Sequence, residues 1–228
     1  MRPKRGHAIV LADGAVPTRA RLDAAWPGWN DGVDLVVAAD GGARHAGALG
    51  LRLDRWVGDG DSIDPRDLES LAAAGVVVEQ LEREKDASDT EFALLAAIAA
   101  GAATVTILGA LGGPRTDHAL TNVALLDHPA LAGHPSRLFD EHAARISFLA
   151  GPAEAELAGH VDDLVTLVPV GGPAVGVTTR GLRYPLRNET LEPGSSRGLS
   201  NVRTAPQAGV ALREGRLLLI ETPATVGR

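Results

Sequence analysis

Three apolar runs in the first half of the chain each lead into glycine. They are HAIVLADG (7–14), VDLVVAADGG (33–42) and ATVTILGALGG (103–113), and helix-like segments lie between them. Continuous apolar runs of this length are typical of strands that are buried on both faces of a parallel sheet. We therefore expect an α/β domain with a doubly wound, mostly parallel sheet, whose ligands gather where strands end and helices begin.

From about Asp140 onward the apolar runs are shorter and are separated by Gly, Pro and Asn. We expect four strands here: RISFLA (145–150), DLVTLVPV (163–170), AVGVTTRG (174–181) and GRLLLIET (215–222). No clear helical pattern lies between them, which favours an antiparallel, β-sandwich-like domain. The boundary is expected within 132–142, and we assign residues 1–138 to the α/β domain and 139–228 to the β-rich domain.

Composition narrows the class of protein. The 228 residues are 45% hydrophobic, contain no cysteine and carry a formal net charge of −7. A protein this acidic is a poor partner for nucleic acid, whose phosphates need a basic face. The absence of cysteine suits a reducing compartment, and the first apolar run is too short to span a membrane. We expect a cytoplasmic protein with neither a nucleic-acid nor a membrane partner.

The segment WVGDGDSID (56–64) collects aspartates behind a short apolar run. If its backbone is extended, Asp59 and Asp61 project from the same side, and their carboxylates can reach one ion. Hard oxygen ligands without cysteine or paired histidines favour magnesium over zinc. A simple Gly/Asp turn explains the same residues, so this motif alone leaves both interpretations open.

A second acidic segment, EKDASDTEFALLAAIAAG (84–101), has the pattern of a helix start. Ser88 and Glu91 fit a capping box, which predicts a helix over 89–100 that ends at Gly101. Asp86 and Asp89 would lie at its first turn, where the helix dipole favours acids whatever their function. Lys85, one of two lysines in the chain, is a candidate partner for a polyphosphate or an ordinary surface lysine.

In ILGALGGPRTDHALTN (107–122) a strand enters a glycine-rich loop, and Thr116 or Asp117 is expected to cap the helix that follows. Backbone NH groups at such a turn can receive phosphate, and Arg115 supplies a forked cation beside them. The loop matches neither the dinucleotide-binding nor the Walker pattern, which leaves a dehydrogenase or a Walker-type hydrolase unsupported. His118 is expected to be a packed or exposed histidine rather than a ligand.

Taken in chain order, these segments resemble the motifs of the thiamine pyrophosphokinase family, also called thiamine diphosphokinase. The resemblance spans nearly the whole chain. Its segments are LADG (11–14), ADGGA (39–43), GDGDS (58–62), KDASDTEFAL (85–94), GGPRTDH (112–118), GLRYPL (181–186) and GSSRGLSN (194–201). By themselves the last two segments, which lie in the β-rich half, indicate only turns.

The resemblance implies transfer of a diphosphoryl group from ATP to the hydroxyl of thiamine, with release of AMP and a requirement for Mg²⁺. It also implies a homodimer in which the α/β domain of one chain and the thiamine-binding, dimerising β-rich domain of the other build each site. The implied magnesium ligands are Asp59, Asp61 and Asp89. The implied contacts to nucleotide and phosphates are Asp40, Gly41, Gly42, Lys85, Gly112, Gly113, Arg115 and Asp117, and those to thiamine are Ser200 and Asn201. Either Asp86 or Asp117 would orient or deprotonate the alcohol.

Three positions depart from the family pattern: Gly60, Val202, and Pro114, which is an extra residue before Arg115. Two other functions are alternatives for the same motifs. One is a pyrophosphokinase for another heterocyclic alcohol, such as a hydroxymethylpterin. The other is a non-catalytic sensor of nucleotide or thiamine diphosphate, which we would expect to have lost part of the acidic set.

Overall fold

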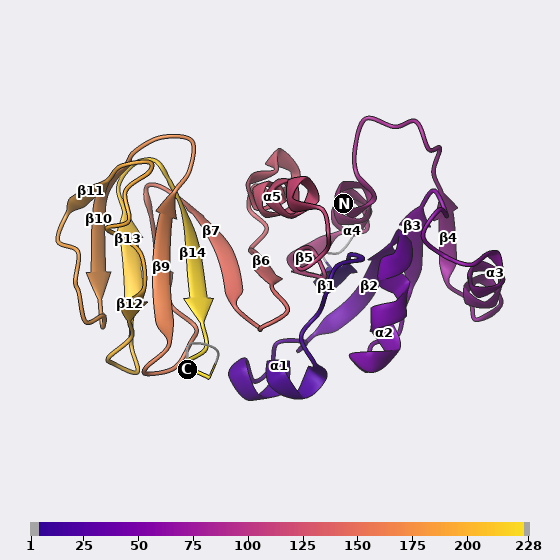
Figure 1. The fold of residues 1–228 in the computed structure, drawn as a ribbon, viewed down its shortest axis with the longest axis horizontal. Coiled ribbons are helices and arrows are strands. Elements are labelled where there is room, and N and C mark those ends of the chain that lie inside the picture. The colour runs from indigo at the N-terminus through magenta and orange to yellow at the C-terminus, as the bar shows by residue number, and fades with distance from the viewer. Residues whose placement is uncertain (1–4, 226–228) are drawn as a thin grey trace. The chain divides into compact units, whose positions relative to one another are not determined.

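The computed structural model describes residues 5–225, which divide into two compact units. The first unit extends to His142 and the second begins at Ala143. Figure 1 draws the helices and strands of both. Among the described residues, no helix is long and apolar enough to cross a membrane.

The first unit contains a sheet of parallel strands in the order β6-β5-β1-β2-β3-β4. Its strands are β1 (Arg5–Leu11), β2 (Val33–Ala39), β3 (Arg55–Gly58), β4 (Val77–Gln80), β5 (Ala102–Leu108) and β6 (Ser136–Phe139). Its α-helices are α1 (Arg19–Ala25), α2 (His45–Ala48), α3 (Pro65–Ala73), α4 (Asp89–Ala99) and α5 (Thr116–Ala124). Three short 3₁₀ helices complete it: η1 (Asp40–Arg44), η2 (Leu125–Asp127) and η3 (Pro129–Leu131).

The strand order reverses direction at β1. The chain runs outward through β2, β3 and β4 on one side of β1, and β5 then returns to pair with β1 on its other side. In a doubly wound sheet the crevice at such a reversal, beyond the carboxyl ends of the strands, is where ligands bind. The strand order therefore predicts that the loops after β1, β2 and β5 contribute to a ligand site.

Local sequence explains the central elements of this unit. Ile9, Val10 and Leu11 of β1 are completely buried, as expected for a strand covered on both faces. The side chain of Ser88 accepts a hydrogen bond from the Glu91 amide at 3.2 Å, which confirms the predicted start of α4. Gly101 follows the helix with φ +96°, a conformation that glycine adopts without strain.

The second unit consists of two groups of antiparallel strands. One has the order β12-β9-β14-β7 and the other β11-β10-β13-β8. Their bounds are β7 (Arg145–Ala150), β8 (Ala153–Glu156), β9 (Leu164–Pro169), β10 (Ala174–Arg180), β11 (Glu189–Leu191), β12 (Asn201–Val202), β13 (Gly209–Leu212) and β14 (Arg216–Thr222). The four strands predicted from the sequence correspond to β7, β9, β10 and β14.

One apolar core holds the second unit together. Leu167 of β9 and Leu217 of β14 belong to the same buried cluster as Val177 of β10 and Val210 of β13. Side chains from both groups of strands thus fill a common interior, which is the arrangement of a β-sandwich. The predicted fold class, a mostly parallel α/β sheet followed by a β-sandwich-like unit, is confirmed.

Candidate active site

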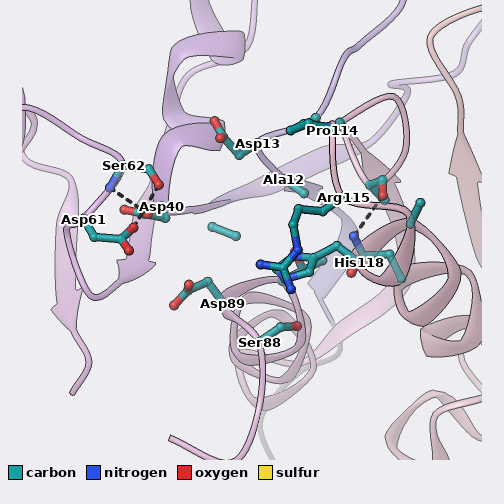
Figure 2. Close-up of a pocket in the computed structure, with 18 residues that line it drawn as sticks. Ala12, Asp13, Asp40, Asp61, Ser62, Ser88, Asp89, Pro114, Arg115 and His118 are labelled. Atoms are coloured by element: carbon teal, nitrogen blue, oxygen red, sulfur yellow. Dashed lines mark hydrogen bonds between the residues drawn. The ribbon is translucent and has the colours of Figure 1, made fainter. Parts of the chain in front are cut away.

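A cavity of about 390 Å³ lies at the strand-order reversal of the first unit. It is bounded by the loops that follow β1, β2, β3 and β5 and by the first turns of α4 and α5. Figure 2 shows acidic side chains on one side of this cavity and Arg115 projecting into it from the other. Its lining residues include Asp13, Gly14, Asp40, Asp61, Ser62, Ser88, Asp89, Gly113, Pro114, Arg115, His118 and Asn122.

Three carboxylates converge at the acidic side. Asp40, Asp59 and Asp89 each offer one oxygen, and these oxygens lie within 4.8 Å of one another. They come from different places in the sequence: the end of β2, the loop after β3, and the first residue of α4. We call this set the acidic cluster. Carboxylate oxygens are among the ligands that Mg²⁺ prefers.

Asp40 is the most buried member of the acidic cluster. Only 6% of the residue is exposed, and its Oδ1 atom has no hydrogen-bond partner among the described residues. Its backbone is fixed, because the buried Trp56 indole donates to the Asp40 carbonyl at 2.9 Å. Burial raises the pKa of the Asp40 carboxyl above its usual range, and the neighbouring Asp61 and Asp89 raise it further. A buried carboxylate with one oxygen left without a hydrogen-bond partner among the described residues is suited to a cation.

The expectation that Asp59 and Asp61 project from one extended strand is wrong. Strand β3 ends at Gly58, and Gly60 has φ +81°, which folds the chain into a turn. The Asp61 amide donates to Asp59 Oδ1 at 3.1 Å, and the Asp61 carboxylate accepts the Ser62 hydroxyl at 2.9 Å. The acidic cluster therefore contains Asp59, while Asp61 lines the cavity beside Asp40 (Figure 2).

Lys85 is held by the acidic cluster. Its Nζ atom lies 2.7 Å from Asp59 Oδ2 and 3.1 Å from Asp89 Oδ1. The hydrogen bond from Lys85 lowers the pKa of Asp59. Burial alone would lower the pKa of Lys85, but the two carboxylates outweigh it and raise that pKa. Its sequence neighbour Asp86 is exposed and does not line the cavity.

The glycine-rich loop after β5 supplies the cationic side of the cavity. Arg115 Nε donates to Asp117 Oδ1 at 3.0 Å, and one terminal nitrogen of Arg115 donates to Asp117 Oδ2 at 2.5 Å. This forked contact holds the pKa of Asp117 far below its usual range. Gly113 and Pro114 line the same cavity, so the extra proline has not removed Arg115 from it. Gly112 is adjacent to them, with φ +74°.

The prediction that Thr116 or Asp117 caps α5 is wrong. The helix begins at Thr116, its cap position is Arg115, and no side chain there makes a capping hydrogen bond. Asp117 is instead paired with Arg115 through two hydrogen bonds. His118 is exposed, one of the two states expected, and lines the cavity as well.

Main-chain contacts join the loops that bound the cavity. The Gly14 amide donates to the Gly109 carbonyl at 2.7 Å, joining the loops after β1 and β5. A Cβ atom at Gly109 would collide with the carbonyl of Ala12, and one at Gly42 would collide with the carbonyl of Leu11. Side chains are therefore excluded at the points where these loops meet. At Gly41 the neighbour is the Asp13 side chain, which lies where a Cβ atom would be but can move more easily than a carbonyl.

The sequence interpretation gave no role to Asn122, which lines this cavity, or to Arg44, which contacts the lining residue Asp13. Arg44 donates to both the carboxylate and the backbone carbonyl of Asp13, which fixes the loop after β1. Asn122 is buried and donates to the Ala110 carbonyl at 2.9 Å. One signal was available for Asn122, because it lies four residues after His118 and so on the same face of α5.

In the second unit, Ser200 and Asn201 differ in exposure. Ser200 is exposed and has φ +52°, and its amide donates to the Thr166 hydroxyl at 2.9 Å. Asn201 is 7% exposed, and its side-chain oxygen accepts from the amides of Tyr184 and Val202. Its amide group donates to the Tyr184 carbonyl at 2.7 Å. The Asn201 side chain therefore holds the backbone of Tyr184 and Val202 in place. The side chains of Tyr184 and Leu199, by contrast, are exposed.

Comparisons with known proteins agree in both units. Residues 28–134 match the model of the thiamin pyrophosphokinase catalytic domain, and residues 156–217 match that of its vitamin B1 binding domain. The curated thiamine pyrophosphokinase of Bacillus subtilis is 26% identical over 195 residues, which cover 86% of this chain and 90% of that protein.

Solved structures show the same likeness. A crystal structure of thiamine pyrophosphokinase from Bacillus subtilis has a TM-score of 0.80 and 25% identity, with 96% of this chain and 99% of that chain covered. The enzyme from Candida albicans shares the fold at 15% identity, with a TM-score of 0.74 and coverage of 97% and 95%. With both family domains matched in order and the fold shared over almost its whole length, the chain belongs to the thiamine pyrophosphokinase family.

Proposed function

We propose that this protein transfers the diphosphoryl group of ATP to the hydroxyl of thiamine, giving thiamine diphosphate and AMP. The observation that carries the proposal is the cavity at the strand-order reversal, where Asp40 and Asp89 of the acidic cluster face Arg115 across one space. Phosphoryl-type transfer depends mainly on positioning and on neutralising negative charge, so a site for a cation opposite a forked guanidinium is suited to it.

The acidic cluster is proposed to hold Mg²⁺. Its fit rests on Asp40, whose buried Oδ1 has no hydrogen-bond partner in the described part of the chain, and on the convergence of Asp59 and Asp89 with it. Asp61, next to Asp40, is close enough to contribute directly or through a bound water. Mg²⁺ bound there would neutralise charge on the transferred diphosphoryl group.

The remaining cavity groups are proposed to position the nucleotide. Arg115 presents a planar fork that matches phosphate oxygens, and the exposed backbone at Gly112 and Gly113 allows close approach of the phosphates. Gly41 and Gly42 are buried and do not line the cavity, so their proposed part is to hold the loop after β2. Asp117 holds Arg115, and its strongly lowered pKa makes it a poor base near neutral pH. We therefore propose that Asp117 positions Arg115, and Asp86 remains a candidate for orienting the alcohol.

Thiamine is proposed to bind at the second unit, near Ser200 and Asn201, as the family resemblance implies. Because Asn201 is occupied by the backbone of Tyr184 and Val202, it would shape the pocket, while Ser200 would contact the substrate. We further propose a homodimer in which each site combines the acidic cluster of one chain with Ser200 and Asn201 of the partner chain.

One assay tests the function. Purified protein is incubated with ATP, Mg²⁺ and thiamine, and AMP and thiamine diphosphate are measured. Equal release of the two products is expected, and neither should form without Mg²⁺. Product from a hydroxymethylpterin but not from thiamine would replace the substrate. Tight binding of thiamine diphosphate without any AMP would instead establish a sensor.

A further inference from the structure

The ammonium group of Lys85 neutralises part of the negative charge of the acidic cluster. Its ammonium bridges Asp59 Oδ2, at 2.7 Å, and Asp89 Oδ1, at 3.1 Å, and only 13% of its side chain is exposed. These two carboxylates belong to the set that converges with Asp40. The ion pairs of Lys85 among the described residues are with Asp59 and Asp89, and none is with Asp40. The Oδ1 atoms of Asp40 and Asp89 both lack a hydrogen bond of regular geometry among these residues, although Asp89 Oδ1 is within ion-pair distance of Lys85. Lys85 therefore compensates part of the cluster and leaves its most buried member uncompensated.

This contact competes with metal binding. Mg²⁺ binds oxygen at about 2.1 Å and demands near-octahedral geometry, so an ion held by Asp59 and Asp89 through Oδ2 and Oδ1 would need the two oxygens that now face Lys85. An ammonium within hydrogen-bond reach of those oxygens would lie only a few ångströms from the dication, in a partly buried place where like charges repel strongly. The cluster has room for one cation of this kind at these oxygens, and in this structure it is Lys85.

We propose that Lys85 is a resident counter-ion that a divalent cation displaces from Asp59 and Asp89, so that metal binding frees its ammonium for the nucleotide phosphates. This inference rests on the proposed function, because it presumes that the acidic cluster is the metal site. Lysine suits the exchange: it is a compact point charge on a flexible stem, whereas the rigid fork of arginine is harder to redirect. Lys85 would also hold the cluster together before metal arrives and lower its affinity for free metal.

The test measures Mn²⁺ binding without nucleotide, by electron paramagnetic resonance and calorimetry. Removing the competitor in Lys85→Met should tighten Mn²⁺ binding by about tenfold, within the range typical of coupled sites. Arg83→Met is the matched control. Arg83 is exposed in the same loop and acts on Asp59 only at long range, so its removal lowers the charge equally without vacating the cluster.

The melting temperature is measured as well, because Lys85→Met is expected to be less stable than wild type. Without metal, Lys85→Met should melt below wild type, because Asp59 and Asp89 repel each other, and Mn²⁺ should raise its melting temperature more than that of wild type. Lys85→Gln, which can still donate to Asp59, should also bind Mn²⁺ more tightly than wild type while keeping more of the stability.

The outcomes separate this inference from the proposed function. Mn²⁺ binding that Asp59→Asn abolishes in an otherwise wild-type protein supports the metal site. If Lys85→Met then binds Mn²⁺ with unchanged or weaker affinity, Lys85 does not compete with metal and the inference is overturned. An equal gain in Arg83→Met overturns it too, because general charge would explain the effect. If neither wild type nor Lys85→Met binds Mn²⁺, the metal site is wrong and the inference falls with it.

Discussion

The Ser62 amide donates to Asp40 Oδ2 at 3.2 Å, so the unpartnered Oδ1 is the second oxygen of a carboxylate whose first oxygen is already satisfied. The Trp56 indole fixes the backbone of the same residue from the buried side. One half of the carboxyl is therefore used for structure and the other half is free for a ligand. A substitution that removes the charge of Asp40 but keeps its hydrogen bonding therefore tests the structural role and the ligand-binding role separately.

Asp40→Asn is expected to stabilise the fold and weaken metal binding. An asparagine can still accept the Ser62 amide, tolerates the positive φ of this position and can donate to Asp61. Loss of a buried charge should raise the free energy of unfolding at neutral pH by about 1 kcal/mol, as is common when a functional residue is replaced. Chemical denaturation measures the gain, and a less stable Asp40→Asn would show that the ionised carboxylate is already compensated.

The comparison of Asp40→Asn with wild type also gives a prediction about the pH dependence of stability. The pKa of Asp40 is raised in the folded protein, so ionising this carboxyl costs stability at pH values above that raised pKa. The cost shrinks as the pH falls through the raised pKa and vanishes below the ordinary Asp value near 3.9. The stability difference between Asp40→Asn and wild type should therefore be largest at neutral pH and disappear toward pH 4. A difference that stays constant with pH would contradict the assignment.

Asp61→Asn should lower turnover by several powers of ten while the protein stays folded, since diphosphoryl transfer would lose part of its charge neutralisation. Steady-state kinetics and circular dichroism measure the two effects. Asp67→Asn, which removes the same charge from an exposed position in α3, is the control and should retain wild-type turnover. Near-normal turnover of folded Asp61→Asn would place this residue outside the metal site.

Arg115→Lys keeps the positive charge but loses the planar fork that now grips Asp117. The loss of a charged hydrogen bond to phosphate should reduce kcat/KM for ATP by roughly 10- to 100-fold, with a smaller effect on thiamine. Initial rates with each substrate varied in turn distinguish the two. Unchanged kinetics would mean that another cation, with Lys85 the first candidate, binds the phosphates.

Asn201→Ala is expected to destabilise the second unit. It removes both partners of the Tyr184 backbone and the acceptor of the Val202 amide, and the loss should cost about 2 kcal/mol. Ser200→Ala, at an exposed neighbour, should change stability by less than about 0.5 kcal/mol. Urea denaturation compares the two variants, and equal stability would show that the Asn201 contacts are dispensable.

Complementation tests the shared site. Asp61→Asn is mixed with a folded variant that carries changes at both Ser200 and Asn201, each inactive alone. After subunit exchange, about half of the dimers are hybrids with one intact site of two, so activity should approach about a quarter of wild type. If mass spectrometry shows exchange but no thiamine diphosphate forms, each site is built within one chain.

Apolar patterning predicted the buried strands well, because a strand covered on both faces is an uninterrupted apolar run. It located β1, β2 and β5 to within a few residues. It did not single out β4, whose residues are mostly exposed at the edge of the sheet, or β6, which lies inside the segment expected to divide the domains. Edge strands and short strands lack a pattern that separates them from loops.

The acidic cluster was only partly predictable. Local spacing paired Asp59 with Asp61, but the positive φ of Gly60 turns the chain and breaks the assumed alternation. Convergence of Asp40 with Asp59 and Asp89 depends on strand order, which brings the ends of β2 and β3 to the start of α4. Only the family resemblance had drawn attention to Asp40, and nothing in the sequence indicated that its Oδ1 atom would lack a partner.

The close approach of the loops after β1 and β5 has a consequence for inhibitor resistance. Gly14 and Gly109 line the cavity, and a side chain at either would strike a neighbouring carbonyl. A competitive inhibitor anchored to the main-chain groups of these loops would contact atoms that no codon change can replace without disturbing the loops themselves. Selection under such a compound should therefore yield escape variants at exposed lining residues, for instance at His118, rather than at these glycines.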